Sequence, residues 1–75
     1  MLTESQLDVL HVIRHHGPLP DHALVPIVQH VAGAHWSSSG IRTRRRELEH
    51  RGLVEAAGVV STSSGRSAQL FRVKP

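Results

Sequence analysis

Apolar side chains recur at helical spacing in three successive segments of the chain. In the first segment, residues 4–16, the apolar positions are Leu7, Val9, Leu10, Val12 and Ile13. Thr3 and Gln6 have the spacing of a capping box, in which each side chain binds the other residue's backbone amide. Gly17-Pro18 then ends the segment. The pattern predicts a helix over residues 4–16, with Leu2 and Leu7 placed as a hydrophobic staple at its start.

The second segment follows a short extended connector, Leu19-Pro20-Asp21. Asp21 suits an N-cap position, because its carboxylate can accept from the free amides of a helix start. The apolar residues that follow have helical spacing: Leu24, Ile27, Val28 and Val31. The helix is expected to end near Ala32-Gly33. Pro26 conflicts with this pattern, since proline inside a helix removes one hydrogen bond and crowds the preceding turn. Two alternatives follow: a kinked first turn, or a regular helix that begins near Pro26.

A polar loop around Trp36, over residues 34–39, separates the second helix from a third. Trp36 is expected to cover the core beside that third helix. Hydroxyl side chains suit the N-cap, so the third helix is expected to begin at one of three serines, Ser37, Ser38 or Ser39. It should run to about Arg51, with Gly52 as the glycine that ends it.

The last third of the chain reads as two strands. Leu53-Val54 opens an extended stretch that Val59-Val60 continues, a turn-rich loop follows over residues 61–66, and residues 69–73 alternate as a second strand. The expected fold class is therefore α+β, mainly α. It is a winged helix-turn-helix, in which three helices precede a β-hairpin wing, in a single domain over residues 1–75.

Composition narrows the classes of protein that the chain can belong to. Its 75 residues include no cysteine, which excludes disulfides and thiolate zinc sites. No apolar run approaches the roughly 20 residues of a membrane span. No signal peptide is expected, because acids and not bases precede the first apolar positions. We therefore expect a cytoplasmic protein with no membrane association.

No catalytic or cofactor site is expected. The chain has seven histidines, and His11 and His15 are four residues apart, but no third metal ligand is identifiable. Exposed histidines on helix surfaces are the simpler interpretation. There is no glycine-rich phosphate loop and no arrangement typical of a catalytic triad. The sequence predicts a protein that is not an enzyme and binds no metal or cofactor.

The charge is concentrated in the second half of the chain. Residues 1–41 contain one base and three acids, and residues 42–75 contain eight bases and three acids, for an overall net charge of +3. Five of the bases lie within ten residues, and all five are arginines: Arg42, Arg44, Arg45, Arg46 and Arg51. A guanidinium can fork onto a phosphate or a guanine edge, which an ammonium cannot.

A helical wheel separates the residues of the third helix. Leu48 and Ile41 mark the side that faces the core, and Arg44 and Arg45 border it, so that one of them is expected to pack its stem inward and pair with an acid. The opposite face carries no acid and consists of Ser39, Arg42, Thr43, Arg46 and His50.

Such a face fits the major groove of double-stranded DNA, where arginines can fork onto guanine acceptors. The hydroxyl-rich start of the helix can hold a phosphate, and Arg66 in the hairpin loop can reach an adjacent phosphate or the minor groove. The expected DNA-binding residues are Ser38, Ser39, Arg42, Thr43, Arg46, His50 and Arg66. A solvated arginine face, paired with glutamates, is the simpler alternative for the arginine run alone.

Three motifs carry a resemblance to known families: Gly17-Pro18-Leu19, Ser39-Gly40-Ile41-Arg42-Thr43-Arg44-Arg45-Arg46-Glu47-Leu48 and Gly52-Leu53-Val54. They resemble the winged-helix superfamily of MarR-like regulators, where the recognition helix ends in a Leu-Glu-x-x-Gly-Leu-Val run. They are closest to small helix-turn-helix DNA-binding proteins of actinobacterial phages, whose Thr-x-Ser-Gly-Arg wing resembles Thr62-Ser63-Ser64-Gly65-Arg66.

The resemblance implies DNA binding through Arg42, Thr43, Arg46 and Arg66. MarR-like regulators carry extra dimerisation helices that this chain lacks, so their ligand pocket and obligate dimer are not implied. We expect a phage or bacterial transcriptional regulator that prefers particular DNA sequences, as a monomer or weak homodimer. The alternative is a winged helix used as a protein-interaction module that binds a host protein.

Overall fold

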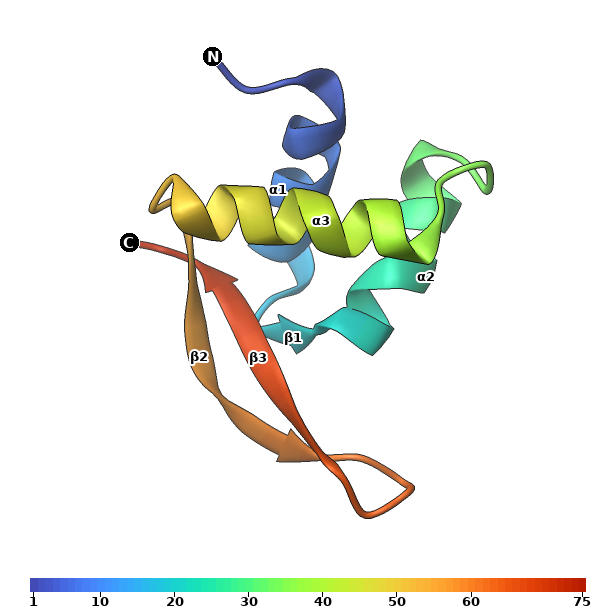
Figure 1. Cartoon of the computed structure of the whole chain (residues 1–75), viewed down its shortest axis with the longest axis vertical. Coiled ribbons are helices and arrows are strands. Elements are labelled where there is room, and N and C mark those ends of the chain that lie inside the picture. Colours follow the sequence, from blue (N-terminus) through green and yellow to red (C-terminus); the bar gives the residue numbers. More distant parts are fainter.

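The computed structural model describes all 75 residues, which form three helices and a three-stranded antiparallel sheet (Figure 1). The chain is therefore α+β, as predicted. In chain order the elements are α1 (Glu4–His16), β1 (Leu19–Pro20), α2 (Asp21–Ala32), α3 (Ser38–His50), β2 (Val54–Ser61) and β3 (Ser67–Val73).

Helix α1 has the predicted bounds because its start is encoded locally. The Thr3 hydroxyl accepts from the amide of Gln6 at 3.2 Å, and the Thr3 amide donates to Oε1 of Gln6 at 3.0 Å. The predicted capping box is therefore confirmed. The apolar stripe is not quite as predicted: Leu7 is 43% exposed, and Gln6 occupies a buried position instead.

Helix α2 begins one residue earlier than a capping Asp21 would require. Pro20 is its N-cap, and no side chain caps the helix, so the expectation that Asp21 would be the N-cap is wrong. Asp21 is the first helical residue, and its carboxylate pairs with Arg45 instead. The helix is continuous through Pro26, so the alternative in which it begins near Pro26 is also wrong. Val31, expected on the apolar side, is 67% exposed.

Helix α3 is bounded by two local signals. The Ser37 hydroxyl accepts from the amide of Gly40 at 3.0 Å, which confirms one of the three predicted serine caps. At the other end the helix stops at His50, and Gly52 adopts a φ of +75°, which suits glycine. Backbone bonds from Leu53 to Leu48 and from Gly52 to Glu49, both 3.0 Å, complete a Schellman motif.

The sheet has the strand order β1-β3-β2, and all its pairs are antiparallel. Strands β2 and β3 form the predicted hairpin, with a bulge between Ala56 and Val59 in β2. The prediction of two strands was incomplete, because the connector before α2 adds a third: Leu19 pairs with Phe71, and Pro20 with Leu70. This short strand ties the start of α2 to the hairpin.

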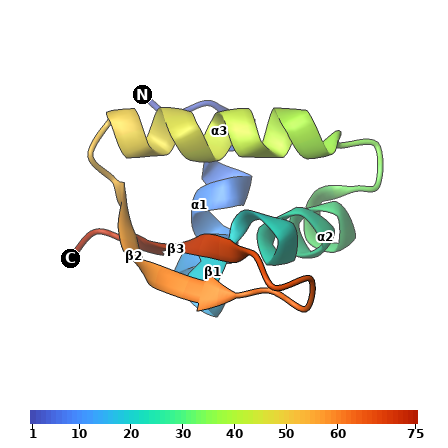
Figure 2. The ribbon, with the colours of Figure 1, turned by 60° about the horizontal axis from the view of Figure 1, so that its bottom comes forward.

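One hydrophobic core joins all the elements. Helix α3 lies on one side of the molecule and the sheet on the other, with α1 between them (Figure 2). Trp36 is partly buried against this core, as predicted. None of the three helices is long and apolar enough to cross a membrane. The eleven buried apolar side chains are Val9, Val12, Ile13, Leu19, Leu24, Val25, Val28, Ile41, Leu48, Val54 and Phe71.

Candidate nucleic-acid interface

The inner side of α3 is fixed by apolar burial. Ile41 and Leu48 are fully buried, and they lie on the side of the helix predicted to face the core. Because these two residues are seven positions apart, they mark the same side of the helix two turns from each other. Their burial sets the rotation of α3 about its own axis, and hence which residues point outward.

The flank of α3 that faces α1 carries a closed polar network. Nε of Arg44 donates to Glu47 Oε1 at 2.6 Å, and Nη2 donates to Oε2 at 3.2 Å. Nε2 of the buried Gln6 also donates to Glu47 Oε1, at 3.0 Å. The hydrogen bonds from Arg44 and then from Gln6 lower the pKa of the Glu47 carboxyl, because they stabilise its charged form. The capping residue of α1 is thereby also an anchor for α3.

The opposite flank of α3 is held by Arg45, whose side chain is only 10% exposed. Its guanidinium forks onto Asp21, with Nε at 2.9 Å from Oδ1 and Nη2 at 2.6 Å from Oδ2. Nη1 donates to Glu49 Oε1 at 2.8 Å. The same group lies 4.0 Å from the ring centroid of Phe71, within the range of a cation–π contact. The hydrogen bond to Asp21 above all raises the pKa of Arg45, so the guanidinium stays charged.

Arg45 therefore binds α3 to α2 and β3 at once. This is the inward-packed arginine that the helical wheel predicted for position 44 or 45. Arg44 is the second structural arginine, because it pairs with Glu47 on the flank of α3 that faces α1. A fork onto a partly buried carboxylate is among the stronger ion pairs in proteins, since two charge-assisted hydrogen bonds share one planar geometry.

The outward face of α3 has no ion pair. Arg42, Arg46 and His50 are exposed and lie on successive turns of the helix. Thr43 is exposed between them, and its hydroxyl donates to the Ser39 carbonyl at 2.8 Å. Ser38 and Ser39 are exposed in the first turn. The structure thus brings all six predicted residues of the third helix to its solvent side.

The acids of the chain are mostly used in ion pairs elsewhere. Four of the six carboxylates, Asp21, Glu47, Glu49 and Glu55, pair with Arg44, Arg45 or Arg72. The other cations form no ion pair, and these are Arg14, Arg42, Arg46, Arg51, Arg66 and Lys74. The positive charge that remains free on α3 therefore lies on its outward face and at its carboxyl end.

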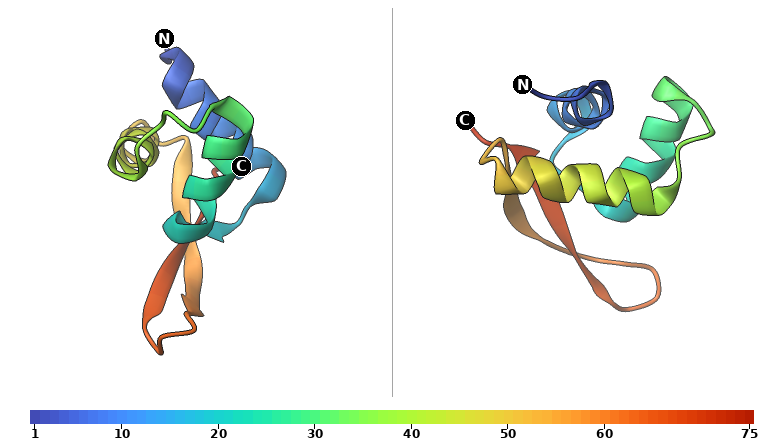
Figure 3. Two further views of the ribbon diagram at one scale, coloured as in Figure 1. Left: turned by 90° about the vertical axis from the view of Figure 1, so that its right-hand side faces the viewer. Right: turned by 45° about the horizontal axis from the view of Figure 1, so that its top comes forward.

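The predicted hairpin residue lies apart from the helix. Figure 3 shows the hairpin projecting away from the helical body, with the loop of Arg66 at its far end. The loop is closed by two bonds between the same residues: the Thr62 amide donates to the Arg66 carbonyl at 2.7 Å, and the Arg66 amide donates to the Thr62 hydroxyl at 3.2 Å. This closure holds the backbone of Arg66 in place and leaves its side chain exposed.

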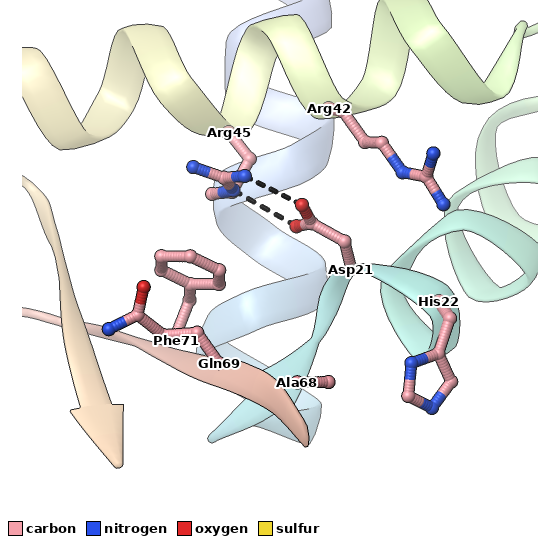
Figure 4. Close-up of a pocket in the computed structure, with 7 residues that line it drawn as sticks. All are labelled: Asp21, His22, Arg42, Arg45, Ala68, Gln69 and Phe71. Carbon is pink, nitrogen blue, oxygen red and sulfur yellow. Dashed lines mark hydrogen bonds and ion pairs between the residues drawn. The ribbon is translucent and has the colours of Figure 1, made fainter. Parts of the chain in front are cut away.

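A groove connects α3 with the hairpin loop. Its central hollow lies between α3, the first turn of α2 and β3 (Figure 4). Arg42 lines this hollow from α3, His22 from α2 and Gln69 from β3. A second hollow adjoins it along Arg46 and His50, and a third continues from His22 to the hairpin loop and Arg66. We call these three hollows together the α3–hairpin groove.

Sequence reasoning did not single out His22 and Gln69, which line this groove beside Arg42. His22 is exposed near the start of α2, and nothing in the sequence pattern distinguishes it from the other exposed histidines. Gln69 is a polar residue in an alternating strand, which is typical of any solvent-facing position. Only the packing of α2 and β3 against α3 brings both residues beside Arg42.

No group of three or more histidine, aspartate or glutamate side chains is arranged to hold a metal ion. The rings of His11 and His15 stack on α1, with their centroids 6.2 Å apart and nearly parallel. Compared with protein-family models and with curated proteins, the sequence gives no match. The resemblance to MarR-like and phage helix-turn-helix proteins therefore stays a prediction.

Proposed function

We propose that the chain is a winged helix-turn-helix protein that binds double-stranded DNA. Helix α3 is the reading helix, and the β2–β3 hairpin is the wing. Three helices with an antiparallel hairpin over one core are compatible with this fold. Regulation of transcription in a phage or a bacterium belongs to the same proposal, and it rests on the sequence motifs alone.

The observation that carries the proposal is the separation of paired from unpaired arginines on α3. Arg44 and Arg45 are neutralised on the two flanks, whereas Arg42 and Arg46 point outward without a partner. A solvated helix face would be expected to pair its arginines with the glutamates of the same helix. Here both glutamates of α3 are already bound to the flanking arginines, which leaves the outward arginines available for an external anion.

The dimensions and chemistry of α3 suit the major groove. That groove admits one helix, and arginine forks onto the O6 and N7 acceptors of guanine. Thr43 offers a methyl group that can contact thymine, and the exposed serines of the first turn lie where free helix amides favour a phosphate. Arg66, at the end of the hairpin, would contact the DNA backbone on the far side of the major groove.

The direct test is retention of duplex DNA. A gel-shift assay at low salt with random duplex should show retarded complexes, and selection from a random duplex pool should enrich a preferred site. Arg46→Ala should weaken binding to that site, whereas Arg14→Ala, which removes an equally exposed and unpaired charge from α1, should have little effect.

Failure to retain any duplex at low salt would overturn the proposal. The outward arginines would then remain as a surface for an acidic segment of another protein, which is the alternative drawn from the sequence. Equal losses for Arg46→Ala and Arg14→Ala would also count against it, because they would indicate attraction by overall charge without a defined interface.

A further inference from the structure

Two carboxylates lie along the α3–hairpin groove, where an approaching duplex would meet them. Asp21 lines the central hollow together with Arg42 and Gln69. Glu49 lines the adjoining hollow beside Arg46 and His50. A phosphodiester strand that passes between a helix in the major groove and a hairpin beyond it would run along this groove. Two negative charges at that position oppose the strand, because like charges repel over several ångströms.

One guanidinium contacts both carboxylates. Arg45 forks onto Asp21 (Figure 4). It also donates to Glu49, so a single cation lies between the two acids. The ring of Phe71 covers one face of that cation at 4.0 Å. With three donors used and a side chain only 10% exposed, Arg45 has little surface left to present to a ligand.

The neighbours of Arg45 differ in this respect. Arg42 and Arg46 lie one turn apart on the outward face and keep all their donors free. Arg44 is paired, but its acid, Glu47, lies on the flank that also contacts Gln6 of α1, away from the groove. Arg45 is thus the one arginine of the run that faces the groove and is already neutralised.

We propose that the α3–hairpin groove receives one sugar-phosphate strand of the duplex, and that Arg45 is a positioning residue that offsets Asp21 and Glu49 there. Arg45 makes no phosphate contact of its own. It fixes the positions of the two carboxylates and offsets one of their two negative charges, so that the strand meets a smaller repulsion beside Arg42 and Arg46. This inference rests on the proposed function.

The test changes the groove charge in three steps without shortening any side chain to alanine. Arg45→Met removes the cation and leaves two carboxylates. Asp21→Asn with Glu49→Gln removes the acids and leaves the cation. The triple variant removes all three charges with near-isosteric side chains. Arg44→Met is the charge-matched control, because it exposes Glu47 on the flank away from the groove.

Affinity for a labelled duplex is measured by fluorescence anisotropy over a salt series, with circular dichroism used to show that each variant is folded. Arg45→Met should bind about tenfold more weakly than the unchanged chain at low salt, whereas Arg44→Met should lose less than about threefold. The triple variant should bind at least as tightly as the unchanged chain. The double variant should bind most tightly, with a salt slope steeper by about 0.9, since it frees one cation.

Breaking a buried ion pair on one side is strongly destabilising, so both Arg45→Met and the double variant are scored only where circular dichroism shows that they are folded. If neither folds, the triple variant decides, because it leaves none of the three charges without a partner. A triple variant that binds more weakly than the unchanged chain would overturn the proposal. A double variant with the slope of the unchanged chain would overturn the proposal, since Arg45 would then gain nothing from the loss of its acids. A folded triple variant as weak as folded Arg45→Met would overturn it too, because Arg45 would then bind DNA directly.

The same experiment separates this inference from the proposed function. If the unchanged chain binds no duplex at low salt, the DNA-binding proposal itself fails. If the chain binds duplex but the three groove variants do not follow the order of groove charge, only the role of Arg45 and the path of the strand are refuted.

Discussion

Replacing the arginines one at a time counts the ion contacts of the proposed interface. Arg42, Arg46 and Arg66 form no ion pair, so each cation is free to displace one counterion from the duplex, whether it lies at a base edge in the major groove or at a phosphate. Three contacts predict a slope of log affinity against log salt of about −2.7, since each contributes about −0.9 on B-DNA. Removal of any one of the three should therefore reduce the slope to about −1.8.

Arg44 provides the charge-matched control for this series. Its guanidinium is held by both oxygens of Glu47, at 2.6 Å and 3.2 Å, and releases no counterion when DNA binds. Arg44→Ala removes the same formal charge as Arg46→Ala, yet it should leave the slope near −2.7. The assay is an anisotropy titration of one duplex over a salt series, with melting curves to confirm that each variant is folded.

Two results would refute this reasoning. If Arg44→Ala and Arg46→Ala change the slope equally, total charge and not unpaired charge governs binding, and the ion pairs on the flanks of α3 are irrelevant to it. If the unchanged chain binds with a slope near zero, phosphates are not the groups that the outward arginines contact.

Three further predictions concern specificity, stability and pH. Arg46→Ala should reduce the binding free energy for a selected site by about 1–3 kcal/mol and relax base choice at one position, whereas Arg66→Ala should weaken binding to selected and scrambled duplexes alike. If both substitutions weaken binding to the two duplexes in parallel, α3 does not read bases. Leu48→Ala should lower the free energy of unfolding by about 2–5 kcal/mol in urea denaturation, because Leu48 is fully buried. Leu53→Ala, at a position 36% exposed, should lower it much less, and an unchanged urea midpoint for Leu48→Ala would refute the packing of α3. Because the pKa of Glu47 is lowered, its ion pair stabilises the fold fully at pH values above the ordinary carboxyl pKa of 4.5, and this stabilisation is lost as the pH falls through the lowered pKa. The free energy of unfolding, measured over an acid pH series, should show this loss in the unchanged chain and not in Glu47→Gln.

The helix bounds were the most predictable part of the structure, because their signals are local. The capping box fixes the start of α1, and Gly52 fixes the end of α3 within one residue of the prediction. Both signals depend on backbone groups within four or five residues. The outward face of α3 was predictable for a similar reason, since Ile41 and Leu48 alone determine how the helix is rotated.

Side chains with two competing partners were harder to predict. Asp21 could cap α2 or pair with a distant arginine, and the sequence contains no sign that Arg45 lies next to it in space. The structure resolves the competition in favour of Arg45, whose fork makes two parallel hydrogen bonds between oppositely charged groups, whereas a cap would bond the carboxylate to neutral amides. The burial of Gln6 was not predicted for a similar reason, because its second hydrogen-bond partner, Glu47, is 41 residues away in the sequence.

The groove and the strand β1 depend wholly on tertiary packing. Two residues are too few for an alternating pattern, so Leu19 and Pro20 predict only an extended connector, and β3 supplies the pairing. His22 and Gln69 become neighbours of Arg42 only because that pairing draws the start of α2 toward the hairpin. A single sequence offers no periodicity that would reveal such a contact.

The run Arg44-Arg45-Arg46 shows why a count of charges says little about this surface. Successive residues of a helix are turned by about 100°, so three adjacent arginines must point to three different sides. Arg44 pairs with Glu47 on the flank beside α1, Arg45 pairs with Asp21 of α2 and with Glu49 of α3 itself, and Arg46 pairs with no acid. The first two hold α3 in place, and only the third joins Arg42 on the outward face. A basic run on a packed helix therefore supplies both the attachment of the helix and the charge that it presents. The positions of the acids, Glu47 and Glu49 on α3 and Asp21 on α2, decide which arginine has which role.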